Sequence, residues 1–295
     1  MIRLALVGLA TVFAACAGSS PVPASVDRAG TDASLRVMSF NLRMNTPADS
    51  ANAWPHRVDA VAQIVASADV VGVQEALPDM LEDLDARLGG WARIGVGRQA
   101  DGGGEHSAVY YRADRLDVLD AGTFWLSETP GVPGSKSWDA AIERIVTWGR
   151  FRDRRAGDTL AVVNTHFDHV GQRAREHSAR LLVDRLDALA GGGPAVVLGD
   201  FNVTPDNPVY ALLTEGTGLQ DARVASRTPP EGVAATWNGF GRDALVRRID
   251  FLFVRGLDVA RFATRDETIS GTLGTATARY PSDHFPVEAT VARAR

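Results

Sequence analysis

Apolar residues along this chain fall into short runs that stop at polar residues. Residues 195–202, AVVLGDFN, follow a Gly/Pro turn, lack helical periodicity and are interrupted by Gly199, which predicts a short buried strand. Side chains alternate along an extended chain, so Asp200 and Asn202, two positions apart, would face a common cleft. An Asx turn that simply closes the strand explains the same two residues equally well.

The same pattern recurs along the chain. It predicts strands over residues 35–41, 70–75, 107–111, 118–124, 144–151, 159–165, 249–254 and 285–291. We expect the runs 107–111 and 118–124 to be neighbouring strands joined by a turn. Apolar residues at helical spacing predict helices over residues 54–68, 78–88, 173–190 and 208–213. Strands that are followed sometimes by a helix and sometimes by another strand favour a mixed α/β sandwich over a strictly alternating, doubly wound sheet.

The N-terminus has the features of an export signal. Arg3 precedes a run of apolar residues that ends at small residues and Cys16, and this run is too short to span a membrane. Residues 13–16, FAAC, resemble a bacterial lipobox, in which the cysteine becomes the lipidated first residue; cleavage nearby without lipidation is the alternative. We therefore expect a signal peptide over residues 1–15, a Gly/Ser/Pro-rich tether over 16–34, and one domain over 35–295. The mature protein would be a membrane-anchored lipoprotein facing the periplasm or the cell exterior.

Composition narrows the possible partners. The chain has 295 residues and a formal net charge of -5, so no bulk attraction for nucleic acid is evident, although a local basic face stays possible. Cys16 is the single cysteine, so the domain has no disulfide within the chain. Membrane contact is expected only through the lipid anchor, and the sequence carries no signal for an oligomeric state.

Six predicted strands carry polar residues at their ends. These are Asn41, Glu75, His166, Asp200 with Asn202, Asp250, and Asp283 with His284. Carboxylates, amides and imidazoles without thiols form the kind of oxygen-rich site that suits Mg²⁺ or Mn²⁺ rather than a zinc thiolate centre.

In order, the segments SFN, VQE, NTH, GDFN, RID and SDH resemble the motifs of the endonuclease/exonuclease/phosphatase superfamily over about residues 35–293. The resemblance implies a four-layer αββα sandwich, in which helices flank two packed mixed sheets and strand ends from both sheets form the active site. It also implies a divalent-metal-dependent phosphoester hydrolase.

The resemblance further implies a role for each residue. Glu75 would be the main metal carboxylate, with Asn41 beside it and Asp283 assisting. Asp200 would orient or deprotonate the attacking water, and Asn202 would position that water or the phosphate.

The remaining three residues of the set would handle the proton and the phosphate. Asp250 would orient His284 and favour its imidazolium form, and His166 would be a second phosphate donor or a general acid. Structural roles, such as a strand-end cap or a hydrogen-bonded core histidine, are the alternatives for these positions.

Segments outside the six motifs resemble a bacterial subgroup of undefined substrate. They include Gly104-Glu105-His106 and a Pro/Gly-rich loop over residues 126–141 with Trp125 and Trp138 in and beside it. The two tryptophans are candidates for substrate contact, or for the core. Arg144 is a candidate phosphate clamp, with a surface salt bridge as the alternative.

Together these features predict a phosphodiesterase or phosphatase that acts on an extracytoplasmic phosphoester, such as a sugar phosphate, a nucleotide or a phospholipid headgroup. A secreted endo- or exonuclease is the nearest alternative. A lipoprotein that uses this fold as a non-catalytic binding module is a third, and it is disfavoured because every catalytic position is retained.

Overall fold

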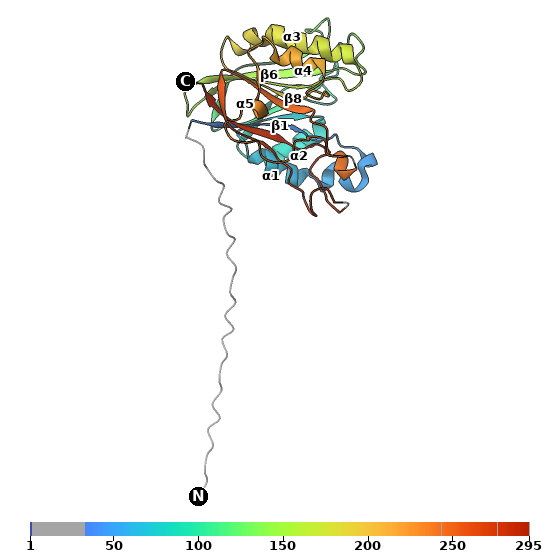
Figure 1. Cartoon of the computed structure of the whole chain (residues 1–295). Coiled ribbons are helices and arrows are strands. Elements are labelled where there is room, and N and C mark those ends of the chain that lie inside the picture. Colours follow the sequence, from blue (N-terminus) through green and yellow to red (C-terminus); the bar gives the residue numbers. More distant parts are fainter. Residues whose placement is uncertain (2–32, 243, 276, 295) are drawn as a thin grey trace.

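The computed structural model describes residue 1 and residues 33–242, 244–275 and 277–294 (Figure 1). The predicted signal peptide and nearly all of the predicted tether fall on residues 2–32 and so lie outside the described residues. None of the helices in the described part of the chain combines the length and apolar character that a membrane crossing requires.

Two six-stranded sheets pack face to face. The first has the order β11-β12-β1-β2-β4-β3, with β11 Leu257–Thr264, β12 Val287–Arg293, β1 Leu35–Asn41, β2 Val70–Gln74, β4 Val109–Arg112 and β3 Trp91–Ile94. The second has the order β5-β6-β7-β8-β10-β9, with β5 Leu116–Trp125, β6 Ile145–Asp153, β7 Thr159–His166, β8 Ala195–Asp200, β10 Asp250–Arg255 and β9 Gln220–Asp221. Both sheets are mixed, since β1 runs parallel to β2 and β7 parallel to β8 among antiparallel neighbours.

Helices cover the two outer faces. As Figure 1 shows, α1 (Val58–Ala66) and α2 (Pro78–Arg87) lie on one side of the sandwich, and α3 (Gln172–Ala190) and α4 (Pro208–Thr214) on the other. Short elements complete the chain: α5 (Ala222–Ala225) and 3₁₀ helices at Pro47–Asn52, Trp54–His56 and Gly239–Gly241. The predicted αββα sandwich is therefore confirmed.

Strand β8 is apolar at successive positions because both of its faces are buried. Val196 and Leu198 belong to the core between the sheets, whereas Ala195 and Val197 belong to the core under α3 and α4. Because successive side chains point to opposite faces, a strand buried on both faces must be apolar at every position.

The prediction for residues 107–124 is wrong in one respect. β4 and β5 follow each other along the chain, but they belong to different sheets. The buried Arg115 lies between them and pairs with Asp69, at 3.0 Å, just before β2, and with Asp153, at 2.8 Å, at the end of β6. This arginine lies where the chain passes from one sheet to the other, and it joins a carboxylate of each.

Arg57 binds together two segments that carry predicted site residues. Its guanidinium donates to the carbonyl oxygens of Leu42 (2.7 Å), Arg43 (3.0 Å), Asn52 (2.6 Å) and Pro281 (2.6 Å). Burial lowers the pKa of Arg57 to about 10, so it stays charged at neutral pH. The segment after β1 is thereby fixed to the segment before β12.

Replacing Arg57 should therefore destabilise the fold. We expect Arg57→Ala to lower the free energy of unfolding by about 3 kcal/mol or more, because several carbonyls would lose a charged donor at once. Urea unfolding followed by circular dichroism measures this. Arg87→Ala, which removes a surface arginine from α2, serves as the control and should leave the midpoint almost unchanged; equal midpoints for both variants would contradict the role of Arg57.

Candidate active site

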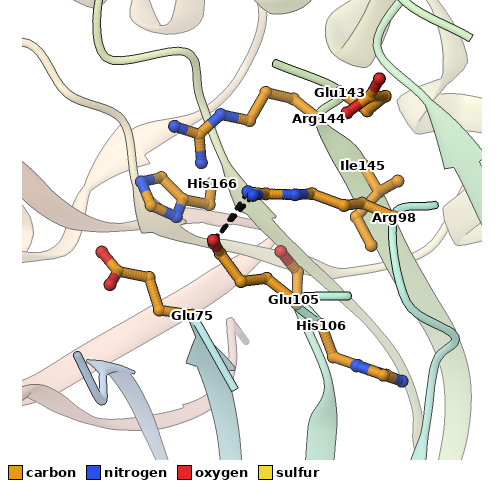
Figure 2. Close-up of a pocket in the computed structure, with 9 residues that line it drawn as sticks. Glu75, Arg98, Glu105, His106, Glu143, Arg144, Ile145 and His166 are labelled. Carbon is orange, nitrogen blue, oxygen red and sulfur yellow. Dashed lines mark hydrogen bonds and ion pairs between the residues drawn. The ribbon is translucent and has the colours of Figure 1, made fainter. Parts of the chain in front are cut away.

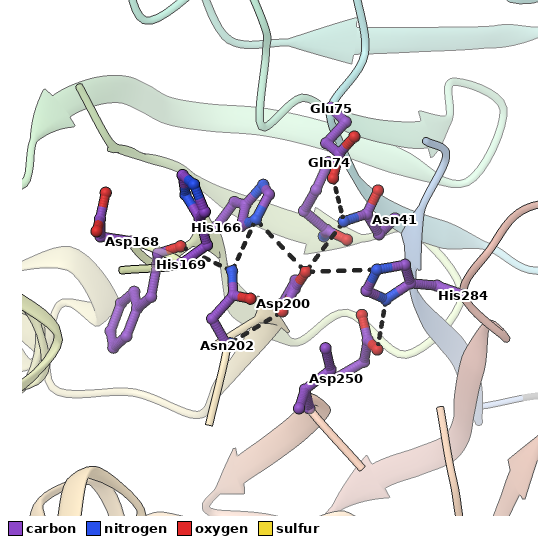
Figure 3. A network of polar contacts seen from close by, with 12 residues as sticks. Asn41, Gln74, Glu75, His166, Asp168, His169, Asp200, Asn202, Asp250 and His284 are labelled. Atoms are coloured by element: carbon purple, nitrogen blue, oxygen red, sulfur yellow. Dashed lines mark hydrogen bonds and ion pairs between the residues drawn. The ribbon is translucent and has the colours of Figure 1, made fainter. Parts of the chain in front are cut away.

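The predicted site residues meet at one end of the sandwich (Figure 3). Strand register brings several of them together, since Asp200 on β8 is the direct partner of both His166 on β7 and Asp250 on β10. From the first sheet, Asn41 ends β1 and Glu75 follows β2. The structure thus brings strand ends of both sheets into one site.

The carboxylate of Asp200 lies at the centre and is almost fully buried. Its Oδ2 accepts a hydrogen bond from Asn41 Nδ2 at 3.0 Å and lies 3.4 Å from His166 Nε2, and its Oδ1 accepts from the backbone N–H of Asn202 at 2.9 Å. Burial and the neighbouring Asp250 raise the pKa of Asp200 to about 7, although His284 lowers it. A carboxylate that titrates near neutral pH is suited to general-base chemistry.

His284 is held between two carboxylates. Its Nδ1 lies 2.9 Å from Asp250 Oδ2, and its Nε2 lies 3.7 Å from Asp200 Oδ2. Burial lowers the pKa of His284, but Asp250 and Asp200 raise it to about 10, so the ring is an imidazolium at neutral pH. Trp237, which was not predicted as a site residue, packs edge-on against this ring with centroids 4.9 Å apart.

Glu75 is partly exposed beside this group. Asn41 Nδ2 donates to its Oε1 at 3.0 Å, and the backbone N–H of Met44 donates to its Oε2 at 3.1 Å. Burial raises the pKa of Glu75, but the His284 imidazolium and these two hydrogen bonds outweigh burial and leave the pKa lowered. Glu75 and Asn202 both have positive φ, 58° and 51°, a backbone conformation that costs a non-glycine residue about 1–3 kcal/mol and often marks a functional position.

Neutral His166 is joined to Asn202. The Nδ2 of Asn202 lies 3.0 Å from His166 Nε2 and donates to the carbonyl of Phe167 at 3.0 Å. Burial and the nearby Arg144 hold the pKa of His166 well below its usual value. The neutral ring therefore accepts at Nε2 and carries its proton on Nδ1.

Asp283, shortly before β12, adds a further carboxylate to the site. Asp283 is buried, with Arg43 Nε 3.9 Å from its Oδ2. Burial raises the pKa of Asp283 to about 6, and Glu75 adds to the increase although the His284 imidazolium opposes it. Asp283 and Glu75 thus lie close enough to repel each other.

A metal ion could be held here. Asp200, Asp250 and His284 each offer one ligand atom, and these three atoms lie within 4.8 Å of one another. Glu75, Asn41 and Asp283 provide a second set of oxygen donors beside them.

A small cavity opens next to Glu75 and His166, and Arg98, Glu105 and Arg144 face it (Figure 2). Arg144 is only 5% exposed, and its Nε lies 3.8 Å from Asp168 Oδ2, so it does form an ion pair, but a buried one and not one at the surface. Its Nη2 lies 3.1 Å from His169 Nδ1, whereas its buried Nε has no hydrogen-bond partner among the described residues. Arg144 is thus a buried cation on the wall of the cavity, and its role as a phosphate clamp stays a prediction.

The two predicted tryptophans do not line this cavity. Trp125 is buried behind it and donates from Nε1 to the carbonyl of Arg98 at 2.6 Å. Trp138 stacks on His177 of α3, with centroids 4.8 Å apart and ring planes 10° apart. Each indole thus contacts another part of the protein: Trp125 a backbone carbonyl and Trp138 an imidazole ring.

The sequence did not identify Arg98 as a residue of the site, because the loop that carries it contains no recognisable motif. Glu105, by contrast, lies in one of the segments that resemble the bacterial subgroup.

The sequence profile described as "Endonuclease/Exonuclease/phosphatase family" matches residues 38–284. The chain therefore belongs to this family and is a phosphoester hydrolase.

Solved structures resemble the whole domain. A mannosyl-6-phosphatase from Bacteroides thetaiotaomicron is 37% identical with a TM-score of 0.82, and the match covers 88% of this chain and 99% of that one. An endonuclease/exonuclease/phosphatase protein from Bacteroides vulgatus is 38% identical with a TM-score of 0.81, with the same 88% and 99% coverage.

Curated relatives are more distant. Nocturnin of Drosophila melanogaster is 23% identical over 278 residues, which is 80% of this chain and 42% of Nocturnin. An uncharacterized protein of Acanthamoeba polyphaga mimivirus is 24% identical over 190 residues, 54% of this chain and 27% of that protein. The chain therefore spans less than half the length of either relative.

Gly199 places Asp200 at the centre of the site, and a side chain at this position should not be tolerated. Its φ is +150°, and a Cβ atom would lie 2.0 Å from the carbonyl oxygen of Thr165. We expect Gly199→Ala to lower the free energy of unfolding by about 2–3 kcal/mol, because the paired strands would have to separate. Chemical denaturation measures this. Gly89→Ala is the matched control, since a Cβ there meets nothing within 4 Å; a loss as large in the control would contradict the explanation.

Proposed function

We propose that this protein is a divalent-metal-dependent phosphatase that hydrolyses a sugar phosphate outside the cytoplasm. The observation that carries the proposal is the position of the Asp200 network beside a cavity faced by Arg98 and Arg144. The guanidinium of Arg144 suits a dianionic phosphoryl group, whereas that of Arg98 is paired with Glu105. The similarity to a mannosyl-6-phosphatase supports a sugar phosphate as the substrate.

Glu75, Asn41 and Asp283 would hold the ion, Mg²⁺ or Mn²⁺. Their oxygen donors suit such hard cations, and Asp283, whose pKa is raised mainly by burial and further by Glu75, is a carboxylate whose charged form a cation would stabilise. Bound there, the ion would neutralise negative charge on a phosphoryl oxygen.

The group of Asp200, Asp250 and His284 is less suited to an ion. The Nδ1 of His284 is already bonded to Asp250. An imidazolium between two carboxylates also supplies the positive charge that an ion would add.

The other residues would act on water and phosphate. Asp200, with a pKa of about 7, would take a proton from the attacking water, which Asn202 would help to position. His284, oriented by Asp250, would donate to a phosphoryl oxygen from Nε2. Arg144 would clamp the phosphate, and His166 would donate from Nδ1.

A monoester fits better than a nucleic acid. The net charge of -5 gives no general attraction for polyanions. Glu105 and Glu143 also line the cavity, and they would repel the further phosphates of a polynucleotide. Residues 3–16, with their signal-like and lipobox-like pattern, support an exported, lipid-anchored protein.

The assay for function is a substrate panel with Mg²⁺ or Mn²⁺, spanning hexose phosphates, nucleotides, phospholipids, plasmid DNA and RNA. We expect release of phosphate from hexose phosphates and a loss of about 10²–10⁴-fold in kcat for Asp200→Asn, because the general base would be removed. Asp206→Asn, an exposed aspartate nearby, is the control and should keep full activity. Nicked DNA with intact sugar phosphates would instead establish the nuclease, and a folded protein inert on every ester would refute both.

A substitution at Glu75 should show which of the two groups of residues binds the metal ion. We expect Glu75→Gln to weaken Mn²⁺ binding by at least about tenfold, because an anionic ligand is lost, whereas Asp250→Asn should change the affinity little. Isothermal titration calorimetry in phosphate-free buffer measures both. The reverse order of effects would place the ion among Asp200, Asp250 and His284.

A further inference from the structure

The roles above leave the Arg98–Glu105 ion pair without a task. Arg98 Nη2 lies 2.7 Å from Glu105 Oε1, and Nη1 donates to Oε2 at 2.8 Å, which makes a two-point contact. In Figure 2 the pair projects toward His166 and Glu75, and the guanidinium of Arg144 lies beside that of Arg98. The pair is therefore part of the wall that a phosphorylated substrate would meet.

The backbone around the pair is closely fitted. The N–H of Arg98 donates to the carbonyl of Glu105 at 3.0 Å, and that of Gly97 donates to Gly102 at 2.8 Å. A Cβ atom on Gly97 would lie 2.0 Å from the carbonyl oxygen of Gly103, so the two arms of the loop touch. The indole of Trp125 holds the carbonyl of Arg98 from behind. The loop thus presents the pair in a fixed position.

The pair is largely buried, but it reaches the cavity and has unused hydrogen-bonding capacity. The side chains of Arg98 and Glu105 are 15% and 13% exposed, and they line the cavity. A carboxylate can accept about four hydrogen bonds and a guanidinium can donate five, so the contact between them leaves capacity on both. A neighbouring donor and acceptor of this kind match a pair of hydroxyl groups, each of which both donates and accepts.

The charge of Glu105 indicates which part of the substrate lies there. A carboxylate placed against the phosphoryl group or a second phosphate would repel it, whereas a neutral hydroxyl would donate to it. Arg144 faces the same cavity, near enough to Glu105 for their charges to interact, and His166 connects the cavity to the Asp200 network. The phosphate would therefore lie toward Arg144, and the hydroxyl-bearing carbon skeleton toward Glu105.

We infer that the Arg98–Glu105 pair is the subsite that binds hydroxyl groups of the sugar and makes the enzyme prefer sugar phosphates to phosphate esters without hydroxyls. This inference rests on the proposed phosphatase function. It adds the pair as specificity-determining residues and identifies the polyol part of the substrate as the group recognised.

The test compares two monoesters in the metal-supplied, full-length protein. One is a hexose 6-phosphate and the other is 4-nitrophenyl phosphate, which has no hydroxyl groups. We expect Glu105→Gln to lower kcat/KM for the hexose phosphate by about 10–100-fold, mainly through KM, because hydrogen bonds to a charged acceptor are lost. Hydrolysis of 4-nitrophenyl phosphate should stay within about twofold, since the phosphate side of the site is unchanged.

Two further variants keep the result interpretable. Arg98→Gln combined with Glu105→Gln removes both charges, leaves neither ion unpaired, and should show the same selective loss even if the single variant is unstable. Glu231→Gln removes a carboxylate that pairs with Arg261 on the exposed surface, and it should leave both substrates unaffected.

The outcomes are distinct. Equal losses on both esters in folded variants would mean that the pair only supports the loop, and unchanged kinetics on both would mean that it binds no substrate; either result overturns the inference while the phosphatase function stands. If the wild type hydrolyses neither monoester, the proposed function fails, and the inference fails with it.

Discussion

The active site depends on the cost of burying the carboxylate of Asp200. A buried charge without partners is expensive, so its oxygens must accept hydrogen bonds from groups that lie in fixed positions. One donor, Asn41, comes from the first sheet, and another, the N–H of Asn202, comes from the second. Both hydrogen bonds to Asp200 can form only when the two sheets lie in one relative position. In that position the other site residues are also brought together.

Apolar packing alone would not set that position so closely. The core between the sheets consists largely of Val, Leu and Phe side chains, which tolerate small offsets. Behind the site, however, a buried amide pair crosses the interface: Gln74 Nε2 donates to Asn164 Oδ1 at 2.7 Å, and Asn164 Nδ2 donates to the carbonyls of Val73 and Ala108. Such directional contacts fix the offset that the apolar contacts leave free, and the strand ends that carry Asp200 and Asn41 follow from it.

The sequence predicts those parts of the molecule whose signal is local. Residues of β8 show it best, because a strand buried on both faces has an unbroken apolar run and its end is marked by Gly199 and Asp200. Strands β3, β9 and β11 were missed because edge strands carry little periodic signal, and the separation of β4 from β5 depends on ion pairs that Arg115 makes with residues distant in sequence. The strand-end site was predictable by motif, whereas the contact of Arg98 with the cavity arises only in the folded chain.

This difference follows from how the site is divided between strands and loops. The groups that would act on the phosphate are at strand ends, where sheet register fixes Asp200 opposite both His166 and Asp250 and where a change of one residue would reverse every side chain. The pair that faces the remainder of the cavity lies on the loop around residues 97–105, which can change in sequence without disturbing that register. A phosphoester hydrolase built in this way can keep its chemistry while its substrate preference changes, since Glu105 touches neither Asp200 nor its hydrogen-bond donors.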